Sequence, residues 1–413
     1  MAPSVEPRDE DELRDAVAKA LAHHHTLMIE GRGSKPGLGR PVAADRRLSL
    51  AAMSGITYYE PDELVLEAWA GTPLAEIEAR LAENGQHLAF EPPDLGPLYG
   101  VPPGRGSIGG AVACNLSGAR RPFAGAARDH VLGIRAVSGR GEVFASGGRV
   151  VKNVTGYDMS KLLTGSHGTL AVLSRVTLKV LPRSETVRTV LLFGGDRAKA
   201  AEMMAAATAG PWDVSAAAYV PPAAAARSAV DYISGSSGAA AFRLEGSREG
   251  VVARTRDLRA VLGAGGASEE LHTSRSRGFW AEVASGALLP GAGGAGAMIW
   301  RLSLPPALGP LAAGEVEQAF GGETVVDWAG GLVWFALADP GPLEAAVGQA
   351  KELRAIVEKH GGHATALRAP ERVRADLPVF HPEAPAVAAL TRRVKQNFDP
   401  LAVLNPGRMA AGL

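Results

Sequence analysis

Two glycine-rich stretches hold the residues of this sequence that are best suited to bind a phosphorylated ligand. The first, Gly31 to Gly37 (GRGSKPG), directly follows a short apolar run over residues 26–29. Glycines leave the backbone uncovered, so that successive N–H groups can approach the oxygens of an anion. By itself the stretch is also typical of an ordinary surface loop, and the choice depends on the rest of the sequence.

Two familiar nucleotide-binding motifs do not fit the first stretch. The Rossmann fingerprint Gly-x-Gly-x-x-Gly fails because Pro36 stands where the third glycine belongs, and the P-loop fails because no Gly-Lys-Ser/Thr closes the loop. The first stretch therefore does not support binding of a nicotinamide cofactor or of a nucleoside triphosphate.

Three further stretches follow the first in order. They cover residues 104–133 (GRGSIGGAVACNLSG and its continuation), 147–158 (GGRVVKNVTGYD) and 162–172 (LLTGSHGTLAV). Together with the first, this set resembles the FAD-binding domain of the vanillyl-alcohol oxidase/PCMH superfamily. Within it, the set is similar to the smaller flavin subunits, the E subunits, of bacterial glycolate oxidases. The resemblance extends over residues 9–182 and, less fully, over the tail 397–408.

The resemblance implies that FAD is the cofactor. In such a family the first loop holds the pyrophosphate, the second passes along the flavin, the third lies near the ribityl or flavin region, and the fourth lies near the adenine half. FAD carries two phosphates and a wide planar ring, so several glycine turns must converge on it. The residues assigned to FAD on this basis are Arg32, Gly33, Ser34, Lys35, Pro36, Gly37, Ser107, Ile108, Gly109, Gly110, Asn115, Ser117, Thr155, Gly156, Tyr157, Asp158, Gly165, Gly168, Thr169, Val172, Asn405 and Arg408.

A non-covalent attachment of FAD is expected. Relatives that link the flavin covalently place a His in the first loop or a Cys in the second. The first loop offers Lys35 and Pro36 instead, and Cys114 in the second loop is typical of a small buried apolar residue.

Oxidation of a 2-hydroxy acid needs a cation for the carboxylate, a base for the hydroxyl proton and a hydride acceptor. Catalytic relatives, the larger glycolate oxidase flavoprotein and the D-lactate dehydrogenases, carry a His-x-Gly-Asp-Gly-Asn-x-His motif that is absent here. The nearest segment, residues 361–368, retains His363 and Arg368 as the catalytic candidates. Five residues apart on a regular strand, they would face opposite sides, so one small substrate could meet both only at a bulge. A structural histidine at the sheet end remains the alternative for His363, and His381 is expected in a loop.

Two other clusters of charged or titratable residues remain: the role of the first is left open, and no site is expected at the second. Arg120, Arg121 and Arg128 could contact FAD phosphate or an acidic partner, or form a solvated cluster. The side chains of His23, His24 and His25 point in different directions, so no metal is expected there. Histidines are also favoured at a helix C-terminus, because the helix dipole stabilises positive charge at that end.

Composition limits the class of protein. The chain has 413 residues, 46% of them hydrophobic, with Lys plus Arg and Asp plus Glu both at 43. The chain has no net charge that would favour binding to nucleic acid, so nucleic acid is not expected as a partner. The single cysteine excludes a cysteine-ligated iron-sulfur cluster within the chain, so such a cluster would belong to a partner. Neither a secretory signal nor a membrane span is readable, and a cytoplasmic location is expected, with peripheral membrane association through partners left open.

The expected fold is α+β: a PCMH-type FAD-binding domain of two subdomains, an α+β cap domain, and a C-terminal tail that returns to the FAD-binding domain. The predicted boundaries are 1–183, 184–385 and 386–413. Periodicity predicts helices over residues 9–21, 73–82 (with Thr72 as N-cap), 196–207, 248–262, 342–360 and 387–398. It predicts strands over residues 26–29, 64–69, 134–138, 142–145, 169–181, 187–193, 214–220, 239–244, 297–304 and 332–338, and His363 lies on a further one.

The resemblance implies an FAD-binding subunit of a glycolate oxidase complex that oxidises glycolate to glyoxylate. Its partners would be a catalytic flavoprotein sister subunit and an iron-sulfur subunit, and its substrate class small 2-hydroxy acids. Two alternatives stay open. One is a self-sufficient FAD-dependent oxidoreductase of hydroxy acids or sugar lactones, and the other is a subunit in which FAD only stabilises the fold.

Overall fold

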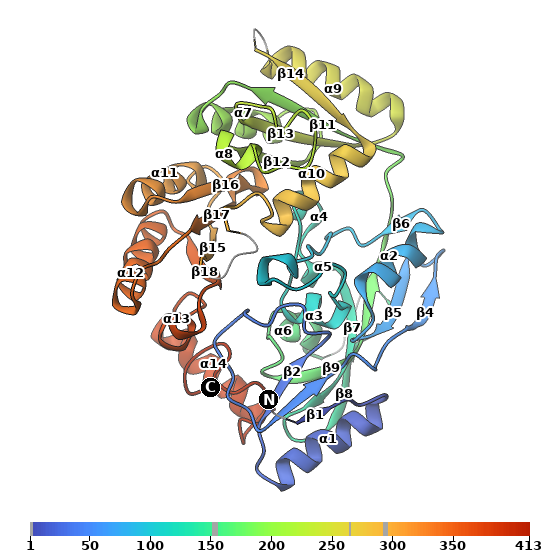
Figure 1. The fold of residues 1–413 in the computed structure, drawn as a ribbon. Coiled ribbons are helices and arrows are strands. Elements are labelled where there is room, and N and C mark those ends of the chain that lie inside the picture. Colours follow the sequence, from blue (N-terminus) through green and yellow to red (C-terminus); the bar gives the residue numbers. More distant parts are fainter. Residues whose placement is uncertain (1–2, 151–155, 264–265, 292–295) are drawn as a thin grey trace.

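The computed structural model describes residues 3–150, 156–263, 266–291 and 296–413. Strands from the N-terminal part of the chain form the lower half of the molecule, and later strands form the upper half (Figure 1). The upper half is called the cap below.

A three-stranded parallel sheet begins the lower half, in the order β1-β3-β2. Its strands are β1 (Ser4–Val5), β2 (Leu27–Glu30) and β3 (Arg46–Ser49), and helix α1 (Glu10–Ala22) lies between the first two in sequence. Asp9 caps α1 by accepting a hydrogen bond from the Glu12 amide at 2.8 Å, and acidic residues fill the first turn, where they favour the helix dipole.

A five-stranded antiparallel sheet completes the lower half, in the order β4-β5-β9-β7-β8. Its strands are β4 (Ile56–Glu60), β5 (Val65–Trp69), β7 (Val131–Ser138), β8 (Val143–Gly147) and β9 (Ala171–Lys179). The predicted hairpin of β7 and β8 is confirmed. Shorter elements join them: α2 (Leu74–Ala82), β6 (Gln86–His87), the 3-10 turn η1 (Pro97–Tyr99), α3 (Ile108–Ala113), α4 (Arg121–Ala124), α5 (Ala127–His130), α6 (Met159–Leu163) and β10 (Leu181–Pro182).

The predicted N-cap of α2 is wrong. Pro73 occupies the position before the first helical residue, and no side chain caps the helix. The Thr72 hydroxyl instead donates to the Trp69 carbonyl at 2.7 Å and accepts from the Gly55 amide at 3.0 Å. A bonded hydroxyl at this tight turn is therefore not available to the helix.

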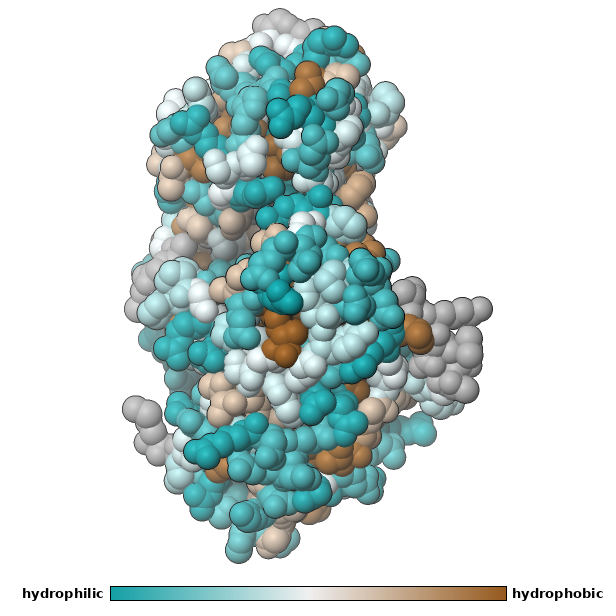
Figure 2. All heavy atoms as spheres, turned by 90° about the vertical axis from the view of Figure 1, so that its right-hand side faces the viewer, coloured by the Kyte–Doolittle hydropathy of each residue, from teal (hydrophilic) through white to brown (hydrophobic). Residues whose placement is uncertain are grey.

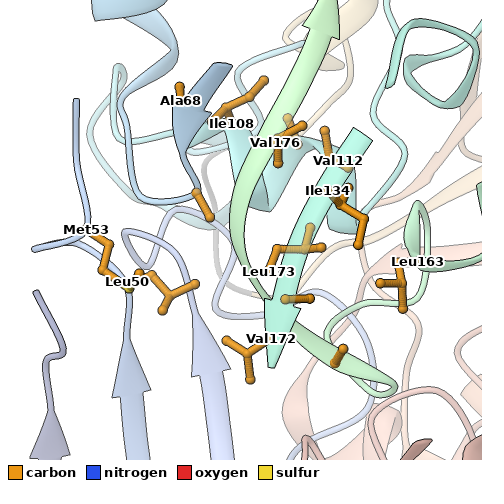
Figure 3. Close-up of a cluster of buried hydrophobic side chains, with 14 of the residues drawn as sticks. Leu50, Met53, Ala68, Ile108, Val112, Ile134, Leu163, Val172, Leu173 and Val176 are labelled. Atoms are coloured by element: carbon orange, nitrogen blue, oxygen red, sulfur yellow. The ribbon is translucent and has the colours of Figure 1, made fainter. Parts of the chain in front are cut away.

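Helix α3 is packed into the core of the lower half. Ile108 and Val112 on α3 meet Ala68, Ile134 and Val176 of the five-stranded sheet (Figure 3). All five residues are at most 3% exposed. This packing fixes the glycine-rich loop before α3 to the sheet.

The cap is an eight-stranded antiparallel sheet in the order β14-β11-β13-β12-β16-β17-β15-β18. Its strands are β11 (Thr186–Phe193), β12 (Val214–Val220), β13 (Ala239–Gly246), β14 (Ser268–His272), β15 (Met298–Ser303), β16 (Glu323–Asp327), β17 (Leu332–Leu337) and β18 (His363–Arg368). Its helices are α7 (Arg197–Ala209), α8 (Pro222–Ala225), α9 (Arg248–Leu262), α10 (Thr273–Ser285), α11 (Gly309–Phe320), α12 (Leu343–Lys359) and α13 (Glu371–Asp376), with the 3-10 turn η2 (Trp328–Gly330).

Both faces of the cap sheet are covered. On one face, Trp300, Phe335 and Val326 pack with residues of α7, α9, α11 and α12. On the other face, Trp334 and Ile299 share a cluster with residues of the lower half, including Leu38, Leu98 and Leu116. The second face of the sheet therefore rests on the loops that follow the glycine-rich stretches.

The tail returns to strand β2 of the lower half, as predicted. Helix α14 (Pro385–Phe398) leads to Leu404, which forms a parallel bridge with Leu27 of β2. The two ends of the chain accordingly lie close together in Figure 1. The division at 183/184 and 385/386 stays a prediction; β10 ends at Pro182, β11 begins at Thr186 and α14 begins at Pro385.

Figure 2 shows mainly polar side chains on the face that lies to the right in Figure 1, with apolar side chains in small separate groups. Of the helices in the described ranges, none combines the length and the apolar character needed to span a bilayer.

Candidate functional site

A cavity of about 300 Å³ lies where the first, second and fourth glycine-rich stretches meet. The tail also reaches it through Arg408. The lining residues are Met28, Ile29, Glu30, Gly31, Arg32, Gly33, Ser34, Lys35, Pro36, Leu38, Leu50, Ser107, Gly109, Gly110, Ala113, Cys114, Ser166, His167, Gly168, Ala171, Val172, Leu173 and Arg408. Segments far apart in sequence thus converge on one space, as predicted for these stretches.

The first loop presents free backbone donors to this cavity. Strand β2 ends at Glu30, and none of the amides of residues 32–35 donates a hydrogen bond within the described part of the chain. A Cβ on Gly31 would lie 2.2 Å from Ser107 Oγ, so only glycine lets the first loop pass so close to the second. Unpaired amides beside a glycine turn are suited to bind phosphate oxygens.

The second loop is held equally tightly. The Ser107 side chain accepts the Gly110 amide at 3.3 Å and caps α3. A Cβ on Gly109 would lie 2.6 Å from the Ala70 Cβ and 2.7 Å from its carbonyl oxygen. The Gly109 amide donates to the Ala70 carbonyl at 2.8 Å and holds the start of α3 against the sheet, while the glycines leave the cavity side open.

Three cationic side chains line the cavity, those of Arg32, Lys35 and Arg408. Arg32 donates to the Ala51 carbonyl at 3.4 Å and forms no ion pair among the described residues. Among the same residues, Lys35 Nζ donates to Ser34 Oγ alone, at 3.1 Å. Arg408 donates from Nη1 to the Leu38 carbonyl at 2.9 Å, while its Nε is buried without a partner. Neither forms an ion pair within 4.0 Å among the described residues, and burial lowers the pKa of Arg408. An unpaired buried cation and free amides together fit the pyrophosphate of FAD.

His167 also lines the cavity and was not among the predicted residues. Burial lowers the pKa of its imidazole to about 3, with a smaller effect of Arg408 and Lys35, so the ring is neutral at physiological pH. Its backbone has φ of +53°, and its ring centre lies 4.7 Å from that of Phe380. The sequence shows His167 between two small turn residues, Ser166 and Gly168, but it does not indicate the direction in which the histidine side chain points.

Several predicted residues lie beside the cavity in supporting roles. Ile108 is fully buried in the core. Asn115 Oδ1 accepts the Arg128 amide at 3.1 Å, and Ser117 Oγ accepts the Ala127 amide at 3.0 Å. The Thr169 hydroxyl donates to the Ser166 carbonyl at 2.7 Å. Gly37, Gly165 and Asn405 likewise do not line the cavity in this structure.

The described residues of the third stretch, 147–150 and 156–158, do not line the cavity. Tyr157 is 90% exposed, Gly156 is exposed, and Asp158 caps α6 by accepting the Lys161 amide at 3.1 Å. Thr155 lies outside the described residues. The structure therefore places Gly156, Tyr157 and Asp158 away from the other FAD candidates, and their assignment to FAD stays a prediction.

The catalytic candidates lie at opposite ends of β18. Ile299 pairs with Arg368 whereas Trp300 pairs with Ala366, so the strand contains a bulge. His363 and Arg368 pair with Ser303 and Ile299, which lie on one face of β15, so the bulge that the sequence analysis named as the exception is present. His363 is exposed, and Arg368 donates to the Gly291 carbonyl at 2.8 Å. The two side chains are not brought together.

A larger cavity, of about 550 Å³, lies between the lower half and the cap and contains none of the predicted FAD residues. Its floor is an ion-pair network in which Arg243 binds Glu91 and Glu245 at 2.8 Å, and Arg120 binds Glu245 at 3.0 Å. Burial lowers the pKa of His87 beside it to about 4. The structure favours none of the three alternatives for Arg120, which are FAD phosphate, an acidic partner and a solvated cluster. Instead, the ion pair of Arg120 with Glu245 connects the lower half to the cap.

Comparison with known proteins agrees with this site. Residues 2–147 match the family model of the FAD binding domain. Over 99% of its length the chain superposes on 88% of p-cresol methylhydroxylase with substrate bound, with a TM-score of 0.72 and 15% identity, which shows the fold. The chain therefore has the fold of p-cresol methylhydroxylase, and its N-terminal part matches an FAD binding domain.

The relatives define the family more closely. The chain is 34% identical to glycolate oxidase subunit GlcE of Escherichia coli (strain K12) over 408 residues, which is 97% of each chain. It is 27% identical to glycolate oxidase subunit GlcD of Bacillus subtilis (strain 168) over 188 residues, or 45% of this chain and 38% of that one. The chain belongs to the family of GlcE-type glycolate oxidase subunits.

Proposed function

We propose that this chain is the non-covalent FAD-binding subunit of a glycolate-oxidising complex, in which electrons pass to an iron-sulfur partner. The observation that carries the proposal is the cavity between the first, second and fourth stretches, with its free amides at residues 32–35 and its unpaired cations Lys35 and Arg408. The likeness to a glycolate oxidase subunit over nearly the whole chain supports the substrate class, small 2-hydroxy acids.

Bound FAD would supply a hydride acceptor at its flavin ring. The chain itself would hold the cofactor. The amides of residues 32–35 and the two cations bind its phosphates, the glycines of the second loop leave room for the ring, and neutral His167 adds an uncharged wall. Cys114 lines the same cavity, and burial raises its pKa, which disfavours the nucleophilic thiolate and is consistent with a dissociable flavin.

The partners are proposed from the family. A sister flavoprotein related to the shorter GlcD match would supply hydride abstraction, since the metal-and-base motif is absent from this sequence. An iron-sulfur subunit would receive the electrons, because one cysteine cannot ligate a cluster. A cytoplasmic location, with attachment to the membrane only through partners, is part of the same proposal.

Reconstitution of the purified chain with FAD is the first experiment. We expect one equivalent of flavin, released intact by acid or heat, with absorbance near ~450 nm as is usual for flavins. Flavin that stays on the chain after acid precipitation would contradict non-covalent binding, and a chain that takes up no flavin would contradict the proposed function.

The assembled complex then separates the alternatives. We expect glycolate to bleach the flavin of the complex but not that of the isolated chain. Rapid bleaching of the isolated chain would support a self-sufficient oxidoreductase instead. Undiminished turnover of a complex that carries a redox-inert FAD analogue in this subunit would support a purely structural flavin.

A further inference from the structure

We propose that Arg121 and Arg301 form a binding site for the carboxylate of a small organic acid, between the FAD-binding domain and the cap. The site rests on the proposed function, because its ligand class, small organic acids, is that of the glycolate-oxidising complex; it would bind the carboxylate without carrying out the hydride abstraction assigned to the sister subunit. Arg121 begins α4 of the lower half, and Arg301 lies on β15 of the cap. Their guanidinium carbons lie 4.4 Å and 5.3 Å from the ring centre of the same side chain, Trp328.

Neither arginine has a close ionic partner among the described residues; Asp129 acts on Arg121, and Asp327 on Arg301, only from beyond ion-pair distance. Within the described part of the chain, neither side chain forms a hydrogen bond or an ion pair within 4.0 Å, and Arg301 Nε is buried without a partner. Burial and, to a smaller extent, the charge of Arg121 lower the pKa of Arg301 to about 10. A buried cation without an ionic partner, as Arg301 is among these residues, is unfavourable, and an anion bound by it together with half-buried Arg121 would reduce that cost.

Asp327, the acid that acts on Arg301, provides little compensation. Asp327 is fully buried, accepts the Trp328 amide with Oδ1 at 2.7 Å, and leaves Oδ2 without a partner. Burial raises the pKa of Asp327 to about 7, so the carboxyl is only partly ionised near neutral pH. It makes no ion pair with Arg301 within the 4.0 Å limit, which leaves the guanidinium available to a ligand.

Trp328 is fixed in place by both halves of the molecule. Its indole N–H donates to the Gly118 carbonyl at 3.0 Å, at the end of the second glycine-rich loop. Its backbone has φ of +52° and that of Ala329 has +55°, a conformation that non-glycine residues rarely adopt and that the surroundings must impose. A strained, bonded indole that carries two free arginines is a rigid platform for recognition.

The site lies on the side of the cap that faces the flavin loops. Arg301 pairs across the sheet with Trp334, which packs in a cluster with Tyr99 and Cys114. The Tyr99 hydroxyl donates to the Leu367 carbonyl at 2.6 Å, and its ring would contact a Cβ on Gly37 at 3.0 Å. Tyr99 therefore connects this part of the cap to the first FAD loop. Arg368, the cation predicted from the sequence, is already bonded to Gly291.

Oxalate, a small carboxylate that cannot be oxidised as a hydroxy acid, is the probe. Titration calorimetry of the FAD-reconstituted chain should give saturable binding that weakens at least tenfold in Arg301→Met and in Arg121→Met. Arg256→Met, at an exposed arginine of the cap, is the control and should bind oxalate as the wild type does. Unchanged oxalate affinity in Arg301→Met, or sulfate competing as well as oxalate, would overturn the assignment.

Thermal unfolding distinguishes ligand binding from a structural role. Removing an uncompensated buried charge should leave the Tm of ligand-free Arg301→Met equal to or above that of the wild type, while the increase in Tm with oxalate is lost. A lower Tm with a retained oxalate shift would show that Arg301 is structural and overturn the proposal. If the chain takes up no FAD, the proposed function fails, but the same oxalate titration still decides whether the arginine pair binds a carboxylate.

Discussion

The side-chain oxygen of Asn405 accepts a hydrogen bond from the backbone amide of Ile29 at 2.8 Å, although 376 positions separate them in sequence. Asn405 also donates from Nδ2 to the His167 carbonyl at 2.9 Å and is 1% exposed. One buried amide thus joins the tail, the strand before the first loop and the fourth stretch.

Asn405→Ala should lower the free energy of unfolding by about 2–4 kcal/mol, because two buried backbone groups lose their partner. Asn405→Asp should be destabilising as well, since a carboxylate cannot donate to the His167 carbonyl. Denaturant unfolding and FAD retention measure both effects. The control is Asn397→Ala, which removes only an exposed bond to the Arg393 carbonyl within α14 and should change stability by less than about 0.5 kcal/mol. Equal effects of the two alanine variants would contradict this role of Asn405.

Arg408→Met should weaken FAD binding at least tenfold, which corresponds to about 1.4 kcal/mol. The reason is that Arg408 lines the cavity and its Nε has no partner within the described residues. Fluorescence titration of the FAD-free chain measures the Kd. Arg392→Met, on the exposed face of α14, is the matched control. Equal FAD affinity in both variants would show that Arg408 does not contact the cofactor.

Gly109→Ala should destabilise the chain by about 1–3 kcal/mol, as overpacking does. The new methyl group would meet Ala70 at 2.6 Å, and Ala70 belongs to the backbone segment that accepts the Gly109 amide. Gly348→Ala, in α12 with nothing within 4 Å of the added group, should instead raise stability by up to about 1 kcal/mol through helix propensity. Thermal unfolding of both variants tests this, and a harmless Gly109→Ala would mean that α3 can shift away from β5.

Asp327→Asn should flatten part of the pH dependence of stability. Burial raises the pKa of Asp327 from 3.8 to about 7 in the folded state, so the folded chain holds a proton that the unfolded chain has lost. Stability therefore falls as the pH rises from about 4 to 7, by about 4 kcal/mol for this group. Unfolding by denaturant at several pH values should show this fall in the wild type relative to Asp327→Asn. Asp62→Asn, on an exposed turn, should keep the wild-type profile; an identical profile in Asp327→Asn would contradict the buried carboxyl.

Local pattern predicted many elements of the fold. The strand over 214–220 and the helix over 248–262 have the predicted bounds, because apolar periodicity reflects which face of an element is buried. The sequence analysis did not predict β14 (SEELH), β16 or helices α10 and α11. Strand β14 is an edge strand with mainly polar residues, and its pairing with β11 depends on a partner that no local window contains.

The sequence by itself determined the cofactor class and most of the stretches that line the cavity, since glycines at Gly31, Gly33 and Gly109 are required by backbone geometry wherever the chain folds this way. Only the tertiary structure decided which side chains share a space. It brought His167 to the cavity, left Tyr157 outside, and separated His363 from Arg368 while placing Arg301 beside Trp328. Spacing in sequence specifies the direction of a side chain within one element, but the convergence of distant elements is set by how their buried faces pack.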